Sequence, residues 1–445
     1  MFPPSVQEWL PEAHLARFVA DIVGKLDLRS LRAGYSGRGV AAYQPEMMIA
    51  LLFYGYATGV FSSRKLERAT YDSVAFRYIA ANQHPEHDTI ATFRRRFLPE
   101  VKACFKQILL IAAESGLLKV GRVSIDGTKI KANASKHHAL SYAHATKMER
   151  RIKNEIDRLL RAAENADSAD VPDGMDIPAE LARRETRLQA IAEAKERIRL
   201  REQERLAAEQ AAYEKKLAER ANRERETGKK HRGSKPKPPS RAINPKAQIN
   251  LTDDESRIMP TGDGFVQAYN AQAAVDCESL LLVSVDVSQS PTDVTLLTST
   301  VTQLVNLPNS LGTVSELLAD AGYFSSSNVD FCEANHITPY ISAGREPHAG
   351  GLARFREPPK LRQKATAKER MQHRLKTKDG RAIYGQRKQT IEPRFGNIKG
   401  VQGFRQFSLR GHENVSGEWQ IIGSAYNLKR MHALSLKIAR RAKAG

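Results

Sequence analysis

Three acidic side chains lie in sequence surroundings that suit phosphate chemistry. Asp126 follows alternating apolar residues and precedes a run of cations, and Asp320 follows the apolar stretch "VSELLA". Glu392 lies within the basic segment "YGQRKQTIEPRFGNIKG". Carboxylate oxygens are preferred ligands of hard divalent cations, and an acid among cations indicates an ion pair or a metal site beside phosphate. An Asp close to a Gly is also a favoured turn residue, so each aspartate alone has a structural interpretation.

The composition favours a globular protein with a polyanionic partner. A chain of 445 residues normally forms two or more domains, and 41 % hydrophobic residues are enough for a core. Lys and Arg number 70 against 50 acidic residues, which gives a formal net charge of +20. This charge favours nucleic acid as a partner. The alternative is a soluble basic protein whose cationic face is only solvated.

The cysteines and the apolar segments indicate the cellular compartment of the protein. Cys104, Cys277 and Cys332 lie far apart without a C-x-x-C pair, so the sequence predicts neither a disulfide framework nor a thiolate zinc site. The first residues lack the pattern of a signal peptide, which is consistent with a reducing cytoplasm. The longest uncharged segment, Met47–Phe61, is shorter than the roughly 20 residues that cross a bilayer, so we interpret it as a buried helix and expect no membrane association.

Residues up to about 115 have the apolar spacing of helices. Within them, two short basic helices are separated by a turn that contains Pro85. Such a pair could grip duplex DNA as a helix-turn-helix motif, or it could be an ordinary packing module. The cations concerned are Lys65, Arg68, Arg77, Arg94, Arg95 and Arg96.

A helical hairpin is predicted after residue 141. Met148, Ile152, Ile156 and Leu159 form a thin apolar stripe, and a Pro- and Gly-containing breaker follows. A longer charged helix then carries a narrow seam with coiled-coil-like spacing, made of Leu181, Leu188, Ile191, Ile198, Leu206, Tyr213 and Leu217. The helix ends in the basic, Pro-rich segment "TGKKHRGSKPKPPSR", which is suited to contact phosphate.

The remaining segments predict an α/β sheet with mixed strand directions. Residues 265–276 and 280–288 alternate with period two and predict an antiparallel strand pair. Helices at 292–307 and 325–336 alternate with strands at 314–320 and 337–342. We therefore place Asp126 and Asp320 at strand ends, where ligands gather in open α/β sheets.

Other polar residues have simpler interpretations. His137, His138 and His144 lack a matching ligand group at zinc spacing, so we interpret them as exposed helix-start residues. Asp276, Asp286 and Asp293 could add carboxylates to the same sheet, but strand-end or helix-capping roles are simpler.

Five segments together resemble the DDE transposases of bacterial insertion sequences that carry a long helical insertion after the first catalytic strand. The segments are "VSIDGTKIKANASK", "YNAQAAVD", "LLADAGYFSSSN", "RKQTIEPRFGNIKGVQGFRQFSLRG" and "AYNLKRMHAL". The resemblance implies an RNase H-like mixed sheet with helices, an all-helical N-terminal domain and a coiled-coil-like helical hairpin insertion. It implies a helical DNA-binding domain at 1–118, a catalytic domain at 119–140 and 249–445, and the hairpin with its basic linker at 141–248.

The resemblance also implies roles for individual residues. Asp126, Asp320 and Glu392 match the catalytic, metal-binding acids. The expected Tyr, Arg and Lys near the glutamate correspond to Tyr384, Arg387 or Lys388, and Lys399, of which Arg387 lies five residues before Glu392 where four is usual. Lys129, Lys131, Arg94 and Arg95 complete the expected DNA contacts. Pro393 predicts a kink or a helix start at Glu392.

The implied reaction is cleavage at the ends of an insertion sequence and joining of the freed 3′ hydroxyls to target DNA. Two Mg²⁺ ions, which Mn²⁺ can replace, would be held by the three acids. The expected partners are double-stranded DNA, as terminal inverted repeats and target, and a second copy of the chain, in the nucleoid of the bacterial cytoplasm. The alternatives are a metal-dependent nuclease without strand transfer, a catalytically silent DNA-binding regulator and a coiled-coil scaffold.

Overall fold

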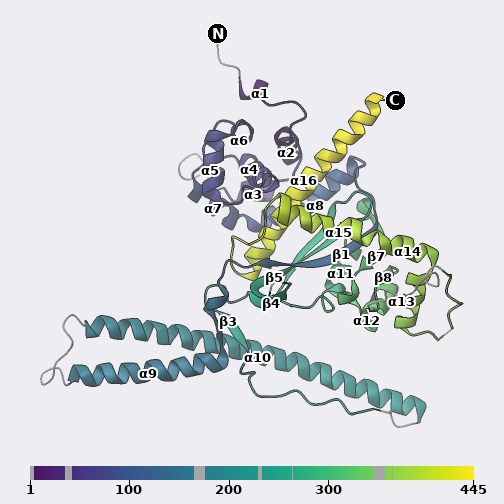
Figure 1. The fold of residues 1–445 in the computed structure, drawn as a ribbon. Coiled ribbons are helices and arrows are strands. Elements are labelled where there is room, and N and C mark those ends of the chain that lie inside the picture. Colours follow the sequence, from purple (N-terminus) through teal and green to yellow (C-terminus); the bar gives the residue numbers. More distant parts are fainter. Residues whose placement is uncertain are drawn as a thin grey trace. The chain divides into compact units, whose positions relative to one another are not determined.

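A computed structural model describes residues 5–35, 43–164, 176–228, 233–262, 264–344, 356–362 and 364–444. The chain divides into two compact units (Figure 1). Unit 1 comprises Met1–Asn133 and Ile258–Gly445, and unit 2 comprises Ala134–Arg257. Each unit is described by itself below.

Unit 1 contains a mixed sheet. Its strands are β1 (Val120–Lys131), β4 (Arg257–Thr261), β5 (Gly264–Asp276), β6 (Leu282–Ser288), β7 (Gly312–Ala319) and β8 (Thr338–Ile341). The order is β4-β5-β1-β7-β8, and β6 also pairs with β5. β1 is antiparallel to β5 and parallel to β7, which is parallel to β8. This order and these directions confirm the predicted RNase H-like mixed sheet.

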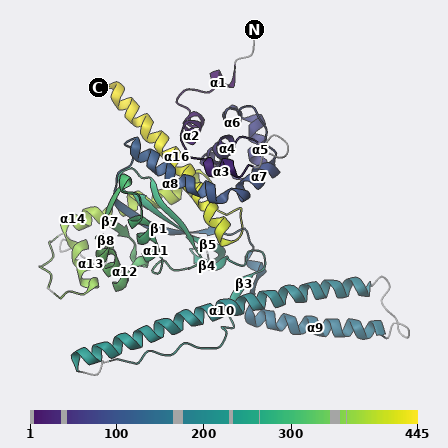
Figure 2. The same cartoon turned by 180° about the vertical axis from the view of Figure 1, so that it is seen from behind.

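Helices surround this sheet and form the N-terminal part of unit 1 (Figure 2). α15 and α16 pack on one face, while α11 and α12 pack on the other. The helices before β1 are α1 (Val6–Trp9), α2 (Leu15–Gly24), α3 (Arg29–Ala33), α4 (Pro45–Thr58), α5 (Ser63–Asp72), α6 (Val74–Ile79), α7 (His87–Arg96) and α8 (Leu98–Glu114). Those after β6 are α11 (Leu297–Val305), α12 (Ser326–Ala334), α13 (Ala367–Lys376), α14 (Lys378–Gly385), α15 (Arg387–Gly396) and α16 (His412–Ala444).

β1 does not end at Asp126, as the sequence predicted, but continues to Lys131. Its pairing with β7 stops at Ser124 opposite Leu318, while its antiparallel pairing with β5 continues to Lys131 opposite Ala268. Because β5 supplies ladder hydrogen bonds along this stretch, the Asp-Gly pair remains extended and forms no turn. Asp126 therefore lies inside a strand, at the point where one neighbouring strand has ended.

The helix that carries Glu392 also differs from the expectation. α15 begins at Arg387 and passes through Pro393. Pro393 cannot donate the usual hydrogen bond to the carbonyl four residues earlier, and it lies in the last turn of the helix. A π-helical turn, Asn397–Val401, follows directly. The predicted helix start at Glu392 is therefore wrong.

Unit 2 confirms the predicted helical hairpin. Ion pairs between Glu149 and Lys195 (2.6 Å) and between Glu155 and Arg184 (3.2 Å) show that α9 (Tyr142–Glu164) and α10 (Ile177–Thr227) are antiparallel. At the base of the hairpin, β2 (Ala139–Ser141) pairs with β3 (Gln248–Asn250). The small core contains Leu140, Ala145, Ile152, Ile191, Ala194, Ile198 and Ile249. In the described part of the chain, no helix combines the length and apolar composition that a bilayer crossing requires.

A buried polar network connects the N-terminal helices of unit 1 to α16. Nη1 of Arg94 donates to the hydroxyl of Tyr56 (2.8 Å), which donates to Oε1 of Glu418 (3.1 Å). Oε2 of Glu418 accepts the backbone N–H groups of Ser408 and Leu409. Glu418 is fully buried and Arg94 is 7 % exposed. Since both charges are desolvated, each depends on the other and on the tyrosine between them.

We expect Arg94→Ala to lower the free energy of unfolding by about 3–5 kcal/mol, because it leaves the Glu418 carboxylate buried without its compensating cation. Arg95 is the matched control, since its side chain is exposed on the same helix. Arg95→Ala should change the free energy by less than about 0.5 kcal/mol. Urea denaturation of both variants measures the difference, and equal stabilities would contradict the role of the network.

Candidate active site

Asp126 lies in β1 and Asp320 directly follows β7, the neighbouring parallel strand. Ser124 pairs with Leu318 in the parallel ladder, and each aspartate lies two residues beyond that pair. Oδ1 of Asp126 accepts the N–H of Gly127, and Oδ1 of Asp320 accepts the N–H of Gly322, both at 2.8 Å. The structure therefore brings the first two predicted acids together.

Burial makes the site electrostatically demanding. The pKa of Asp126 is raised to about 6. Desolvation is the main cause and the carboxylates of Asp320 and Asp293 add to it, while the N–H of Gly127 and the cation of Arg387 act in the opposite direction. A carboxylate with this pKa lacks sufficient compensating positive charge. The pair is therefore suited to attract a cation.

Arg387 connects Asp126 to the third predicted acid. Its Nη2 donates to Oε1 of Glu392 at 2.9 Å, and its Nη1 lies 3.9 Å from Oδ2 of Asp126. The Arg387 side chain is 13 % exposed, whereas the Glu392 side chain is 49 % exposed. Arg387, not Lys388, is thus the cation directed at the acids, and Lys388 is exposed.

Two further predicted residues support the strand and Arg387. Nζ of Lys399 donates to the hydroxyl of Thr128 and to the carbonyl of Lys129, so it anchors β1 just beyond Asp126. Burial raises the pKa of Tyr384, while hydrogen bonds with Ser342 and Arg387 counteract that rise. Neither Lys399 nor Tyr384 is a freely exposed DNA contact.

The donor chemistry fits a divalent cation at the two aspartates. Both are hard oxygen ligands, and the raised pKa of Asp126 reports negative charge that a cation would compensate. Glu392 is held by Arg387 instead. Accordingly, within the described ranges no group of three or more His, Cys, Asp or Glu side chains is arranged to hold a metal ion. A three-acid site requires Glu392 to leave Arg387.

Two family models match the chain. One, described as a transposase domain (DUF772), covers residues 4–96, and the other, described as a transposase DDE domain, covers residues 356–432. The first match covers the N-terminal helices, and the second covers the region of Glu392. Together, the two matches support an insertion-sequence DDE transposase. No curated protein and no solved structure matches it significantly.

The family assignment establishes a DNA-binding enzyme of a class that uses divalent metal ions. The DDE match includes Tyr384, Arg387 and Glu392. It begins after Asp126 and Asp320 and therefore includes neither of them. The position of these two aspartates beside each other is therefore the evidence that this transposase itself provides for them.

The predicted DNA contacts of the transposase fall into two groups. Lys131, Arg95 and Lys388 are exposed. Arg94 is instead buried in the network with Tyr56, so we no longer assign it to DNA. Nζ of Lys129 lies 3.7 Å from Oδ1 of Asp293, and the lysine side chain is 16 % exposed.

Sequence reasoning missed a set of polar residues beneath β1. Asp293, Asn270 and Gln272 form hydrogen bonds with one another on the face opposite Asp126. For Asp293 we preferred a strand-end or helix-capping role to an added carboxylate at the sheet, but no side chain caps α11. The alternation of Asn270 and Gln272 within an otherwise apolar strand was the available indication of a buried polar site.

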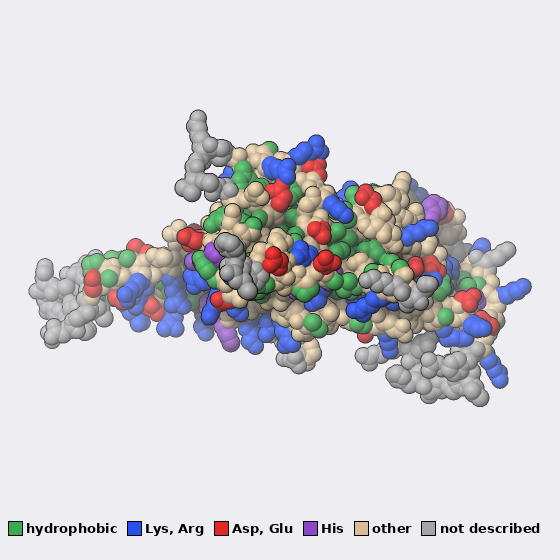
Figure 3. Space-filling view, turned by 90° about the horizontal axis from the view of Figure 1, so that it is seen from above, with side chains coloured by type: hydrophobic (Ala, Val, Ile, Leu, Met, Phe, Trp, Pro, Cys, Tyr) green, Lys and Arg blue, Asp and Glu red, His purple; other side chains and the backbone are tan. Residues whose placement is uncertain are grey.

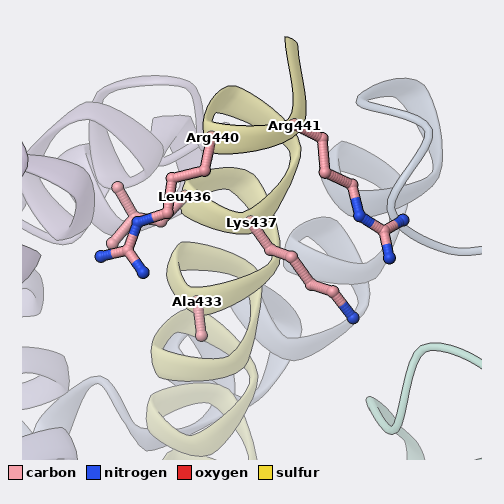
Figure 4. Close-up of a pocket in the computed structure, with 5 residues that line it drawn as sticks. All are labelled: Ala433, Leu436, Lys437, Arg440 and Arg441. Atoms are coloured by element: carbon pink, nitrogen blue, oxygen red, sulfur yellow. The ribbon is translucent and has the colours of Figure 1, made fainter. Parts of the chain in front are cut away.

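Basic side chains also lie away from the acids. A shallow hollow on α16 is lined by Ala433, Leu436, Lys437, Arg440 and Arg441 (Figure 4). It contains three cations and no carboxylate, so it is separate in character from the acid site. Figure 3 shows Lys and Arg side chains on unit 1 and also along the hairpin of unit 2.

We expect Asp126→Asn to stabilise the metal-free transposase at pH 7 by about 3 kcal/mol, because it removes a buried charge whose pKa is raised from 3.8 to about 6. As the pH falls from about 6 towards 3.8, the folded wild type binds its proton before the unfolded chain does. The wild type therefore gains stability over this window and approaches the variant. Denaturation in a chelator at pH 7 and pH 4 measures the effect, and equal stability at pH 7 would contradict it.

Proposed function

We propose that the chain cleaves phosphodiesters at the ends of its insertion sequence and joins the freed 3′ hydroxyls to target DNA, with Asp126, Asp320 and Glu392 as the catalytic acids. The observation that carries this proposal is the juxtaposition of Asp126 and Asp320 beyond the last β1–β7 pair, with Arg387 between Asp126 and Glu392. In the first stage water frees a 3′ hydroxyl, and in the second that hydroxyl attacks the target.

The same three acids would hold two Mg²⁺ ions, for which Mn²⁺ could substitute. When bound, these ions supply activation of the attacking oxygen and stabilisation of the leaving oxygen. Asp126 and Asp320 provide the buried oxygen ligands. Arg387 can exchange Glu392 for a DNA phosphate, because a guanidinium binds phosphate as well as carboxylate through paired N–H groups. That exchange would release Glu392 to join the aspartates.

Exposed cations bind the phosphates of the DNA backbone near the site. Lys131 extends from the end of β1, and Lys388 lies one turn before Glu392 on α15. The N-terminal helices bind the terminal inverted repeats, with exposed Lys65 and Arg95 as phosphate contacts. The two ends of an element are brought together by a homodimer.

We expect Asp126→Asn, Asp320→Asn and Glu392→Gln each to reduce cleavage by at least about a thousandfold while DNA affinity changes little, since each removes an oxygen ligand from the reaction. Gel electrophoresis of labelled element ends measures cleavage, and gel shift measures affinity. A variant that still cuts in Mg²⁺ would exclude its acid from the site.

The product of the wild-type reaction separates the alternatives. A pre-nicked element end and a supercoiled plasmid should yield joined molecules. Cleavage without joining would identify a nuclease, and binding without either product would identify a DNA-binding regulator.

Alanine substitutions at Arg387 and at Lys388 should affect different steps, namely cleavage and DNA binding. Lys388→Ala removes an exposed cation, so we expect weaker DNA binding for all sequences and a decrease of about 1 in the slope of log K against log salt. Arg387→Ala should instead lower the cleavage rate on saturating DNA by about a hundredfold, because it removes the guanidinium that would position a DNA phosphate beside Asp126. Titrations at several salt concentrations and single-turnover cleavage distinguish them, and identical profiles would overturn these separate roles.

A further inference from the structure

Each of the two aspartates in the acid site is followed closely by a glycine that needs space more than a special backbone. Gly127 lies in a strand and Gly322 in a short 3₁₀ turn, and neither has a positive φ. A Cβ added at Gly127 would lie 2.1 Å from Nε2 of Gln272, 2.7 Å from Oδ1 of Asp293 and 2.8 Å from Oδ1 of Asn270. A Cβ added at Gly322 would lie 3.0 Å from Oδ1 of Asp320 and 3.7 Å from Oδ2 of Asp293. The carboxylate of Asp293 and the Gln272 and Asn270 amides that bind it therefore occupy the space beside Gly127, and the same carboxylate is in van der Waals contact range of Gly322.

The position of this carboxylate is fixed by β5. Its Oδ1 accepts Nδ2 of Asn270 at 2.7 Å and Nε2 of Gln272 at 2.9 Å. Lys129 is the residue opposite Asn270, and its Nζ lies 3.7 Å from the same oxygen. Two amides and one ammonium group thus converge on a single carboxylate oxygen.

The loop that carries Asp293 is anchored on both sides. Nδ2 of Asn270 also donates to the carbonyl of Ser290, and Nδ2 of Asn328 donates to the carbonyl of Val294. The same Asn328 amide donates to the carbonyl of Tyr323, in the turn that follows Asp320. The hydroxyl of Tyr323 in turn donates to Oε1 of Gln272. One continuous network therefore connects the Asp293 loop, β5 and the Asp320 turn.

Asp293 and Asp126 lie on opposite faces of β1. Side chains alternate along a strand, so Asp126 and Thr128 face α15 while Gly127 and Lys129 face the side of α11. Their contacts agree with this, since Arg387 approaches Asp126 and Asp293 approaches Lys129. Asp293 supports β1 from behind.

We propose that Asp293 is a positioning residue of the active site: it fills the space beside Gly127 and Gly322 and thereby sets the separation of Asp126 and Asp320. This inference rests on the proposed catalytic role of these two aspartates. A carboxylate in this place acts by its shape and its hydrogen-bond acceptors. A displacement of about 1 Å at a catalytic group can cost about a hundredfold in rate, so the support matters for the chemical step.

A series of substitutions at Asp293 separates shape from charge. Asp293→Asn keeps the shape and one acceptor oxygen, and it should retain cleavage on saturating DNA to within about tenfold. Asp293→Ala empties the space, and Asp293→Glu forces an extra methylene against Gly127, so each should lose about a hundredfold. DNA affinity should stay within about threefold of wild type for all three.

Asp286→Ala is the matched control. Asp286 is opposite Gln272 on β6 and faces the same side of the sheet, but its carboxylate accepts from Gln303 of α11. This variant should keep the wild-type cleavage rate. If Asp293→Glu retained cleavage and Asp293→Asn lost it, the negative charge alone would be required. That result would overturn the positioning role. A loss of DNA affinity equal to the loss of rate would also overturn it.

A readout independent of DNA cleavage tests the contact itself. Gly127→Ala should lower the melting temperature of the wild type by several degrees. The decrease should be less than half as large in the Asp293→Ala background, because the Gln272 and Asn270 amides lose the acceptor that holds them against Gly127 and move away from the new Cβ. An equal decrease in both backgrounds would refute the contact. If the contact is measured but the wild type neither cuts nor joins DNA, the proposed function fails while the structural part of this inference stands.

Discussion

The accumulation of negative charge at one edge of the sheet is the constraint on which the rest of the catalytic region depends. Asp320 and Asp293 lie close enough to Asp126 to raise its pKa, and Asp126 itself is largely removed from water. Like charges in low dielectric repel strongly, so the fold must surround them with cations. Lys129 comes from β1 and Arg387 from α15, so each face of the sheet contributes one.

Because Arg387 has to lie beside Asp126, the helix that carries it must be packed firmly against the sheet. Arg387 reaches Asp126 only because α15 packs on β1 and β5. Phe395 of the same helix stacks on Trp419, whose Nε1 donates to the carbonyl of Gln272. The preceding residue, Glu418, connects α16 to the N-terminal helices through Tyr56. The helices that match the transposase domain model therefore share one packed interior with the catalytic sheet.

The sequence predicted elements better than it predicted their contacts. Period-two alternation located β5 and β6, and the order of segments gave the mixed sheet, because these depend on local burial patterns. The continuation of β1 past Asp126 could not be predicted locally, since it depends on a ladder with β5 more than a hundred residues away. Arg94 was indistinguishable from Arg95 in sequence, and only the tertiary position of Tyr56 separates them. For the same reason the strand was predicted to end at Asp126, with a turn at the Asp-Gly pair as the structural alternative.

The two strands that flank unit 2 have a consequence for the order of folding. β1 and β5 are direct neighbours in the sheet, yet their paired residues Lys131 and Ala268 are separated by the whole of unit 2. Closing so long a loop would be slow if the intervening chain were unstructured, although the entropic cost rises only logarithmically with length. The α9–α10 hairpin has its own small core and a β2–β3 base, so it can form from local contacts. Once it forms, the ends of the intervening segment are already close, and the strand pairing is then equivalent to closing a short connection.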